Sequence, residues 1–415
     1  GLVGSEMCIR DSYKGDSMTG PLDGFKILDL TQVVSGPLAT MLLADQGAEV
    51  LKVEPVDGLG DMTRLPSFDK GGIGAFYMNN NRGKHSLSLD LSQTEGINII
   101  KKLIEGTDVF VQNFRPGAIE RLGLGYEDLS AINPDLVYVS ISGFGPTGPY
   151  SSRPVLDPVI QGICGVISRQ MNPQIPFPDL VRNLYADNST ALTVAQATTA
   201  ALLAREKTGG GQHVEIPMVD ACMYFFWPDG MMDLTMVDDD ANGGILLSSV
   251  YNLTECSDGK IVYFAASDNQ RAGVCAAVGH PEWGEDERFS SMAALAANPQ
   301  NFVLLGEMLA GAFLEMTCEE AIDALIAADV PSGPVLTGDE AIIDPQIVHN
   351  GTLVEWEHPD AGIVRQPKPA ARFSLTEVEP KYSAAHRGEH NEETLLGIGY
   401  STETIENLRN KGVVG

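Results

Sequence analysis

KILDLTQVVSGPLATMLLADQGAEVLKVE, residues 26–54, sets the architecture of this 415-residue chain. Residues 26–30 and 49–53 are apolar runs of strand length, so each predicts a buried strand. Between them, Pro37 is typical of the start of a helix, which we expect to reach about Gln46. A strand, a helix and a second strand in this order predict a βαβ unit.

Further segments of the same kind follow as far as residue 216. We expect strands at 108–112, 136–141 and 212–216, and helices after Asp90, at 118–122 and at 188–206. Regular alternation of strands and helices predicts an α/β fold, in which helices cover both faces of a mostly parallel sheet. Ligands of such sheets bind at the carboxyl ends of the strands. The loops of interest therefore follow Leu30, Val53, Gln112 and Ile141.

The composition describes a globular protein with a strong negative charge. Hydrophobic residues make up 43% of the chain, and 56 acidic residues against 27 basic ones give a net charge of −29. A field of this sign repels nucleic acid and anionic membranes, so neither is an expected partner. No apolar run approaches the roughly 18 residues of a membrane span. The six cysteines are scattered singly, which fits a reducing cytoplasm.

Asp187 stands immediately before the long helix expected at 188–206. The positive end of the helix dipole and the unpaired N–H groups there favour an ionised carboxylate held in one orientation, which suits a nucleophile. Aspartate is also a preferred N-cap residue, so the local sequence alone favours a purely structural role. Asp157, which follows Arg153 and Pro154, has the same structural interpretation.

The first loop, residues 31–37, brings backbone N–H groups to a helix N-terminus, which is a common way to hold phosphate. Glu54, at the end of the second predicted strand, resembles the ribose-binding acid of a dinucleotide site. The Gly-x-Gly-x-x-Gly motif is absent, however. A nicotinamide-dependent dehydrogenase is therefore a weaker alternative, and we expect Glu54 to be structural.

Basic residues carry extra information in so acidic a chain. Arg82, Lys84 and His85 precede a predicted strand, where they could bind phosphates through charge-assisted hydrogen bonds or form a solvated turn. Arg115 and Arg121 leave the same choice open.

No metal site is predicted, because the sequence has no His-x-x-x-His pair, no paired cysteines and no cluster of carboxylate ligands. A Gly-x-Ser-x-Gly elbow and a Walker loop are also absent from the sequence. Taken one by one, the residues describe an α/β ligand-binding protein with one carboxylate of interest.

Seven segments, all in one order, carry a resemblance to a known family. They are PLDGFKILDLTQVVSGPLATMLLADQGAEVLKVE (21–54), NRGKHSLSLDL (81–91), DVFVQNFRPGAIERLGL (108–124), ISGFGPTGPYSSRP (141–154), LYADNSTALTV (184–194), REKTGGGQHVEIPMVDA (205–221) and RGEHNEETLLGIGY (387–400). Together they resemble the class III CoA-transferases, a family that also contains the α-methylacyl-CoA racemases. The resemblance runs from Pro21 to about Tyr400.

In these transferases the nucleophile is an aspartate just ahead of the long helix, a position that Asp187 occupies here. The resemblance implies that Asp187 attacks the thioester of a donor acyl-CoA, forms first an anhydride and then an aspartyl-CoA thioester, and passes CoA to an acceptor carboxylic acid. Asp157 is implied as an assisting residue near the substrate. Acyl-CoA is thus a substrate, and no permanently bound cofactor is expected.

The resemblance also implies which residues contact CoA. The family's loop beside CoA matches Gln32, Val33, Val34 and Ser35. Its contacts to the nucleotide part of CoA match Lys84, His85 and Arg121, and its adenine-side segment matches Asn113 and Phe114. Pro55 stands where the family can have a phosphate-binding arginine, so one contact is missing or replaced.

A second departure separates two reactions of the family. Racemases carry Gly-His-Asp where this chain has Val155, Leu156 and Asp157. Racemisation needs bases on both faces of the α-carbon, and leucine cannot replace the histidine that supplies one of them. We therefore expect CoA transfer, with 2-methylacyl-CoA racemisation and non-catalytic acyl-CoA binding as alternatives.

The family fold combines a Rossmann-like large domain, built from both ends of the chain, with a smaller α+β domain. Two ring-shaped subunits interlock as a homodimer, so we expect the same here. Acidic and Pro/Gly-rich breaks place the large domain at 18–237, the small domain at 238–330 and the returning segment at 331–415. Residues 1–17 show no signal or transit pattern and are expected to lie outside the fold.

Overall fold

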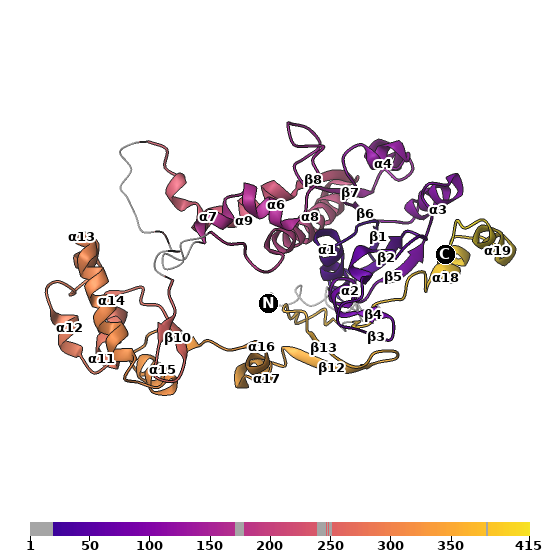
Figure 1. Ribbon diagram of the computed structural model, residues 1–415. Helices are drawn as coiled ribbons and strands as arrows, with labels where there is room; N and C mark the ends of the chain where they lie inside the picture. The colour runs from indigo at the N-terminus through magenta and orange to yellow at the C-terminus, as the bar shows by residue number, and fades with distance from the viewer. Residues whose placement is uncertain (1–19, 171–177, 239–245, 247, 249–250, 379–380) are drawn as a thin grey trace, which may run out of the picture. The chain divides into compact units, whose positions relative to one another are not determined.

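The computed structural model describes residues 20–170, 178–238, 246, 248, 251–378 and 381–415 (Figure 1). The predicted extension at 1–17 and residues 239–240 of the predicted linker lie outside the described residues. Contacts within the chain form two compact units. Unit 1 contains the described residues of Gly1–Gln170, Phe177–Met231 and Gly351–Gly415, and unit 2 contains those of Met232–Asn350.

A six-stranded parallel sheet in the order β5-β2-β1-β6-β7-β8 forms the centre of unit 1 (Figure 1). Its strands are β1 (Lys26–Asp29), β2 (Glu49–Glu54), β5 (His85–Ser88), β6 (Val109–Gln112), β7 (Val137–Ser142) and β8 (Gln212–Pro217). The predicted α/β fold is thereby confirmed. On one side of β1 the chain adds β2 and then β5, and on the other side it adds β6, β7 and β8. The loops that follow β1 and β6 therefore border a crevice at the carboxyl ends of the strands.

Helices cover both faces of this sheet. One face packs against α1 (Ser35–Ala44), α6 (Asp157–Ile163), α8 (Tyr185–Thr208) and α9 (Met218–Gly230). The other face packs against α3 (Thr94–Ile104), α4 (Ala118–Arg121), α5 (Tyr126–Ser130), α18 (Asn391–Gly397) and α19 (Thr402–Asn410). Because both faces are covered, successive strand residues such as Val109, Phe110 and Val111 are all buried, and the strand reads as a continuous apolar run.

The C-terminal part of the chain returns to this sheet. Helix α18 lies against β5, Leu395 and Val413 belong to the core of the second face, and Val414 forms an antiparallel bridge with Leu89. The remaining elements of unit 1 are α2 (Ala75–Asn81), α7 (Val166–Arg169), the 3-10 turn η1 (Met62–Arg64), and the hairpins β3 (Asp69–Lys70) to β4 (Ile73–Gly74) and β12 (Leu353–His358) to β13 (Gly362–Pro367). Segments from both ends of the chain thus build one unit.

Unit 2 combines a three-stranded antiparallel sheet, in the order β11-β10-β9, with a group of helices. Its elements are η2 (Met232–Leu234), β9 (Thr254–Glu255), β10 (Lys260–Tyr263), α11 (Asp268–Ala277), α12 (Pro281–Glu285), α13 (Met292–Ala297), α14 (Pro299–Phe313), α15 (Cys318–Ala327), β11 (Ser332–Pro334), α16 (Gly338–Ala341) and α17 (Pro345–Asn350). The sequence placed residues 331–350 in the returning segment. They lie in unit 2 instead, because β11 pairs with β10.

Two helices of unit 1 begin earlier than the sequence predicted. Helix α1 begins at Ser35, and Pro37 is accommodated in its first turn, where backbone N–H groups have no partner within the helix. Helix α8 begins at Tyr185, and its N-cap residue is Leu184. The N-cap interpretation of Asp187 is therefore wrong, because Asp187 lies inside the first turn. None of the helices in the described part of the chain is long and apolar enough to span a membrane.

A network of buried charges lies at the carboxyl ends of β1 and β2. Lys84 Nζ is 3.0 Å from Asp29 Oδ2, and Lys52 Nζ is 2.8 Å from Asp61 Oδ2. All four side chains are buried. Burial alone raises the pKa of Asp29, but the charges of Lys84 and Lys52, together with hydrogen bonds from two threonines, outweigh it and hold that pKa well below its ordinary value. The network therefore consists of charges that depend on one another.

We predict that Lys84→Met lowers the free energy of unfolding by about 3–5 kcal/mol, because it removes a partner from a buried carboxylate. Urea unfolding followed by circular dichroism measures the change. Lys207→Met, at an exposed lysine near the end of α8, is the control and should stay within about 0.5 kcal/mol of the parent. Equal stability of the two variants would contradict the prediction.

Candidate active site

Asp187 lies in the first turn of α8 with only 5% of its surface exposed. Small residues surround it in this turn, and their hydroxyls are satisfied within the helix, since Ser189 Oγ and Thr190 Oγ1 both donate to the Ala186 carbonyl. These hydroxyls are therefore buried with a hydrogen-bond partner, and α1 packs alongside α8.

Ser35, the first residue of α1, contacts Asp187 directly. Its hydroxyl and its backbone N–H face the Asp187 carboxylate and favour its charged form, and Ser35 is itself buried. Two features shape the loop that leads to Ser35. Val33 has a φ of 72°, a region that a β-branched residue rarely adopts. Gly36 has no room for a side chain, because a Cβ there would lie 2.3 Å from the side chain of Thr31.

Asp157, the first residue of α6, is the second carboxylate of the site. Its Oδ2 accepts the backbone N–H of Asp187 at 2.9 Å, and its Oδ1 accepts Gln161 Nε2 at 2.6 Å. Asp157 and Gln161 are each 1% exposed. The structure thus brings Asp187 next to Asp157, for which the family resemblance implied an assisting role, and it adds Gln161, which no motif of the sequence indicated. Its spacing of four residues from Asp157 on one helix face was the available signal.

The pKa of Asp187 is raised to about 6, chiefly by burial and further by the negative charge of Asp157. The hydrogen bonds from Ser35 lower it, but by less. This result corrects the expectation that the helix N-terminus sets the charge state, since burial dominates. The carboxylate is still mostly ionised at neutral pH, and it is more basic than an ordinary aspartate.

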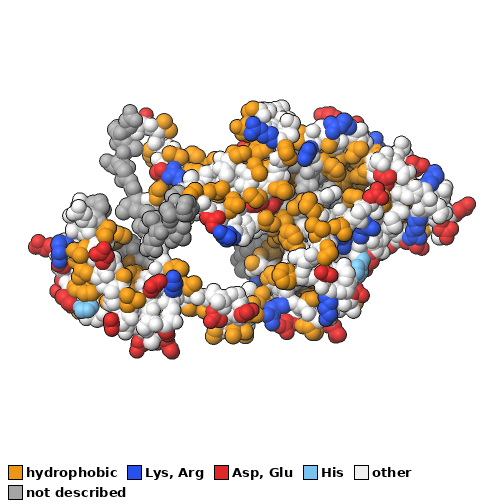
Figure 2. All heavy atoms as spheres, in the orientation of Figure 1, with side chains coloured by type: hydrophobic (Ala, Val, Ile, Leu, Met, Phe, Trp, Pro, Cys, Tyr) orange, Lys and Arg blue, Asp and Glu red, His pale blue; other side chains and the backbone are white. Residues whose placement is uncertain are grey.

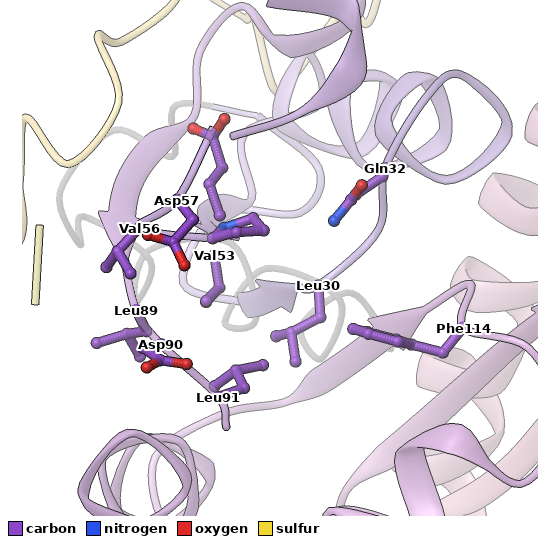
Figure 3. Close-up of a pocket in the computed structure, with 11 residues that line it drawn as sticks. Leu30, Gln32, Val53, Val56, Asp57, Leu89, Asp90, Leu91 and Phe114 are labelled. Carbon is purple, nitrogen blue, oxygen red and sulfur yellow. The ribbon is translucent and has the colours of Figure 1, made fainter. Parts of the chain in front are cut away.

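A pocket of about 140 Å³ opens at the carboxyl ends of the strands (Figure 3). Its lining is mainly apolar and consists of Leu30, Gln32, Val53, Glu54, Pro55, Val56, Asp57, Leu89, Asp90, Leu91 and Phe114. Ligand pockets that enclose a whole small molecule are larger, at roughly 300–1,000 Å³, so this one suits a single ring system such as a nucleobase. Leu30, Leu89 and Leu91 were not predicted, because they read as ordinary strand-end residues.

The loops after β1 and β6 are joined across the crevice. Gln32 N–H donates to Asn113 Oδ1 at 2.9 Å, and Asn113 Nδ2 donates to the Gln32 carbonyl at 2.8 Å. The same first loop therefore places Gln32 at the pocket and Ser35 at Asp187. Phe114 follows Asn113 and lines the pocket, and Arg121 is exposed at the end of α4.

Lys84 and His85 do not line this pocket. Besides Asp29, Lys84 Nζ donates to the Pro37 carbonyl and to Asn81 Oδ1, both at 2.8 Å, so the protein uses all three of its N–H donors. His85 opens β5, and about 13 Å of strand separate it from Leu89 at the pocket. The predicted CoA contacts at these two residues therefore have no counterpart at this pocket.

Glu54 is structural, as the sequence suggested. Arg64 donates to both of its carboxylate oxygens at 2.7 Å, and Tyr77 and Ser86 donate to Oε1. Burial raises the pKa of Glu54, but the hydrogen bonds and charge of Arg64 bring it down to about 2. With its lone pairs occupied in this way, Glu54 is poorly placed to bind a ribose, which argues against the dehydrogenase alternative.

Within the described ranges, one group of residues could offer three metal ligands: His85, His390 and Glu393, whose ligand atoms lie within 4.8 Å of one another. The two imidazole rings stack with centroids 4.1 Å apart at an interplanar angle of 12°. Their nitrogen lone pairs therefore lie in nearly parallel planes and do not converge on a point. His390 Nδ1 also accepts the Ser86 N–H at 3.2 Å. This arrangement fits a stacked pair better than a metal centre.

Comparison with known proteins identifies relatives along nearly the whole chain. The profile described as CoA-transferase family III matches residues 22–391. The chain is 32% identical to human succinyl-CoA:glutarate CoA-transferase, over 95% of this chain and 90% of the relative. It is also 32% identical to formyl-CoA:oxalate CoA-transferase from Shigella sonnei, over 94% of this chain and 99% of the relative.

Two solved structures share the fold. A CAIB/BAIF family protein from Brucella suis superposes with a TM-score of 0.77 at 29% identity, covering 92% of this chain and 100% of that one. The Rv3272 protein of M. tuberculosis superposes with a TM-score of 0.77 at 30% identity, covering 90% and 99%.

We predict that Asp187→Asn makes the protein more stable at alkaline pH. A raised pKa means that the folded state favours the protonated carboxyl, so this stabilisation is complete below the ordinary pKa of 3.8 and is lost as pH rises through about 6. The neutral amide avoids this loss, which amounts to about 3 kcal/mol. The gain should therefore appear at pH 8 and be absent near pH 4.

Urea unfolding at the two pH values measures the difference. Asp323→Asn, at an exposed aspartate in α15, is the matched control and should show no such pH-dependent gain. An Asp187→Asn variant that is less stable than the parent at pH 8 would contradict the burial argument.

Proposed function

The chain belongs to CoA-transferase family III, and we propose that it moves CoA from a donor thioester to an acceptor carboxylic acid by covalent catalysis at Asp187. One observation carries the proposal. A buried carboxylate with a pKa of about 6 lies at the start of a helix, held by Ser35 and by Asp157. Such a group is ionised at neutral pH and is only partly solvated, which favours nucleophilic attack.

The chemistry proceeds through four acyl exchanges at this side chain. An oxygen of Asp187 attacks the donor thioester carbon and expels the CoA thiolate, which leaves a mixed anhydride. The thiolate attacks the aspartyl carbon of the anhydride, releases the donor acid and forms an aspartyl-CoA thioester. The acceptor carboxylate then attacks this thioester to give a second anhydride. The thiolate finally attacks the acceptor's acyl carbon, which releases the new acyl-CoA and restores the Asp187 carboxylate.

The charge balance suits these steps. In the second and third steps, attack at the aspartyl carbon places negative charge on an oxygen of Asp187, and the Ser35 N–H and hydroxyl face this side chain. On the other side, the Asp157 carboxylate accepts a hydrogen bond from the backbone N–H of Asp187 and so holds that backbone in place. We propose that Asp157 assists in this way, by fixing the nucleophile, and that it does not itself become acylated.

CoA binding is proposed at the crevice beside β1 and β6. The adenine ring would occupy the pocket lined by Leu30, Leu89 and Phe114, and the exposed Arg121 would attract the phosphates. The loop of Gln32, Val33, Val34 and Ser35 leads from this pocket to Asp187. A ligand that follows the loop would bring its thioester to the nucleophile, which is why we keep these loop residues in the proposed CoA site and leave out Lys84 and His85.

Racemisation is the less favoured reaction. Leu156 occupies the N-cap position of α6, directly before Asp157, and is 56% exposed. A racemase needs a base on each face of the substrate carbon, and a leucine side chain can neither take nor give a proton. The relatives' names, one acting on succinyl-CoA and glutarate and one on formyl-CoA and oxalate, make short dicarboxylic acids the first acceptors to test.

We further propose that two copies of the chain associate. The exposed residues in the middle of α8 are Leu192, Gln196, Ala200 and Leu203, a stripe without a single charge in a chain of net charge −29. The neighbouring helix α9 exposes Tyr224 and Phe225, and Figure 2 shows hydrophobic side chains gathered over α6, α7 and α9. Exposed apolar side chains gathered in this way are typical of an interface between subunits.

We predict that Asp187 is modified during turnover. With an acyl-CoA donor present, hydroxylamine should trap the activated side chain, and mass spectrometry should locate the adduct at Asp187 for the productive donors of a panel. Asp187→Asn should abolish trapping and lower CoA exchange by at least about 1,000-fold, as expected when a nucleophile is lost. Asp323→Asn should retain both.

Exchange at the parental rate in Asp187→Asn would overturn the mechanism. Deuterium uptake at the α-carbon of a 2-methylacyl-CoA without transfer would show the racemase instead, and tighter binding of NADH than of CoA would show the dehydrogenase. Equal CoA affinity and equally negligible turnover in parent and variant would show a non-catalytic binder.

We predict that light scattering gives the parent a mass of twice the 44.4 kDa of one chain. The double variant Leu192→Glu with Leu203→Glu should shift the mass toward that of a monomer, because it buries two charges in the proposed interface. Leu396→Glu, at an exposed leucine of α18, should leave the mass unchanged. A double variant with the parental mass would place the interface elsewhere.

A further inference from the structure

Gln161 makes four hydrogen bonds beneath the nucleophile. Its Nε2 donates to Asp157 Oδ1 at 2.6 Å and lies 3.2 Å from the Val181 carbonyl and 3.3 Å from the Asn183 carbonyl. Its Oε1 accepts the Val181 N–H at 3.0 Å. The side chain is 1% exposed, so water does not substitute for these partners.

These bonds join two parts of the chain that lie next to each other at the site. Asp157 and Gln161 lie on one face of α6, while Val181 and Asn183 belong to the segment that leads directly into α8. A displacement of that segment would move the first turn of α8, which carries Asp187. The amide of Gln161 is matched to this task, because it offers a donor to Asp157 and both a donor and an acceptor to Val181.

We propose that Gln161 is a positioning residue that holds Asp157 and the Val181–Asn183 segment in register, so that Asp187 meets the thioester in a fixed orientation. This inference rests on the proposed function, because it assigns Gln161 a part in the covalent step at Asp187. It extends that proposal to a residue that is expected to touch neither CoA nor the acyl group.

The arrangement around Asp157 explains why the contact matters for catalysis. Each Asp157 oxygen has a donor on a different side, since Gln161 holds Oδ1 and the Asp187 N–H holds Oδ2. Without Gln161, Oδ1 would remain buried and unsatisfied, and the carboxyl group would gain by rotating toward another donor. Rotation would release the Asp187 N–H. Small losses of alignment between reacting atoms reduce rates strongly.

The first test is Gln161→Met, which keeps the length of the side chain and removes every hydrogen bond. We expect the single-turnover rate of acylation at Asp187 to fall about 10–100-fold, while KM for the acyl-CoA changes less than about 3-fold, because transition-state alignment is lost and the CoA pocket is not touched. Gln300→Met, at an exposed glutamine in α14, is the matched control and should retain the parental rate.

The second test is Gln161→Glu, which distinguishes positioning from packing. The introduced carboxylate keeps the acceptor for Val181 but has no donor for Asp157. Buried beside another carboxylate, it should have a raised pKa, so that lowering the pH protonates it and restores a donor. The rate of Gln161→Glu relative to the parent should therefore rise between about pH 8 and pH 6, whereas the relative rate of Gln161→Met should stay constant over the same range.

The outcomes separate this inference from the proposed function. A parental enzyme that forms no adduct at Asp187 would remove the basis of both. Adduct formation in the parent, together with an unchanged acylation rate in folded Gln161→Met, would overturn the role of Gln161 alone. A relative rate of Gln161→Glu that does not rise at lower pH would show that Gln161 acts only through packing, and would overturn it as well.

Discussion

The hydrogen bond from the Asp187 N–H to Asp157 Oδ2 is the contact on which the site depends. It holds two buried carboxylates next to each other, an arrangement that a folded protein tolerates only when the surroundings supply compensating donors. Donors of Ser35 face Asp187, and Gln161 supplies one to Asp157. Burial, and to a lesser degree the charge of Asp157, still raises the pKa of Asp187. The cost in stability and the reactivity of the proposed nucleophile thus have the same causes.

The sheet topology explains why the binding pocket and the nucleophile are served by one short loop. The chain leaves β1 toward one side and β6 toward the other, so the loop of residues 30–35 borders the crevice between them. One end of the loop lines the pocket at Leu30 and Gln32, and the other end begins α1 with Ser35. The bonds between Gln32 and Asn113 fix the loop against the opposite side of the crevice. Pocket and nucleophile are therefore kept in register by backbone geometry.

The sequence predicted what depends on local pattern and missed what depends on packing. Alternating apolar segments predicted the parallel sheet, whereas the local sequence favoured a structural role for Asp187 and only the family resemblance implied a nucleophile there. Helix α8 nevertheless begins at Tyr185, because Asp157, on another helix, accepts the Asp187 N–H in place of a local capping side chain, and no local signal reports this contact. The sequence left open whether Lys84 binds phosphate or lies in a solvated turn, because a lysine in a basic turn gives no sign that Asp29, far away in the sequence, will bury it. Gln161 depends on a contact with Val181, and that contact exists only in the folded chain.

The strong negative charge of the chain opposes the binding of an anionic ligand. Several of its few cations are already paired within the protein, since Lys52, Lys84 and Arg64 each form an ion pair with a buried carboxylate. These pairs hold the carboxyl ends of the strands in place but leave no charge for phosphate. Attraction must then come from exposed cations such as Arg121, because the N–H groups of Thr31, Gln32 and Val33 in the first loop already donate to Asp29, Asn113 and Asp61. Because exposed charges are screened by salt while the apolar pocket is not, recognition of CoA in this chain should rest more on the adenine ring than on the phosphates.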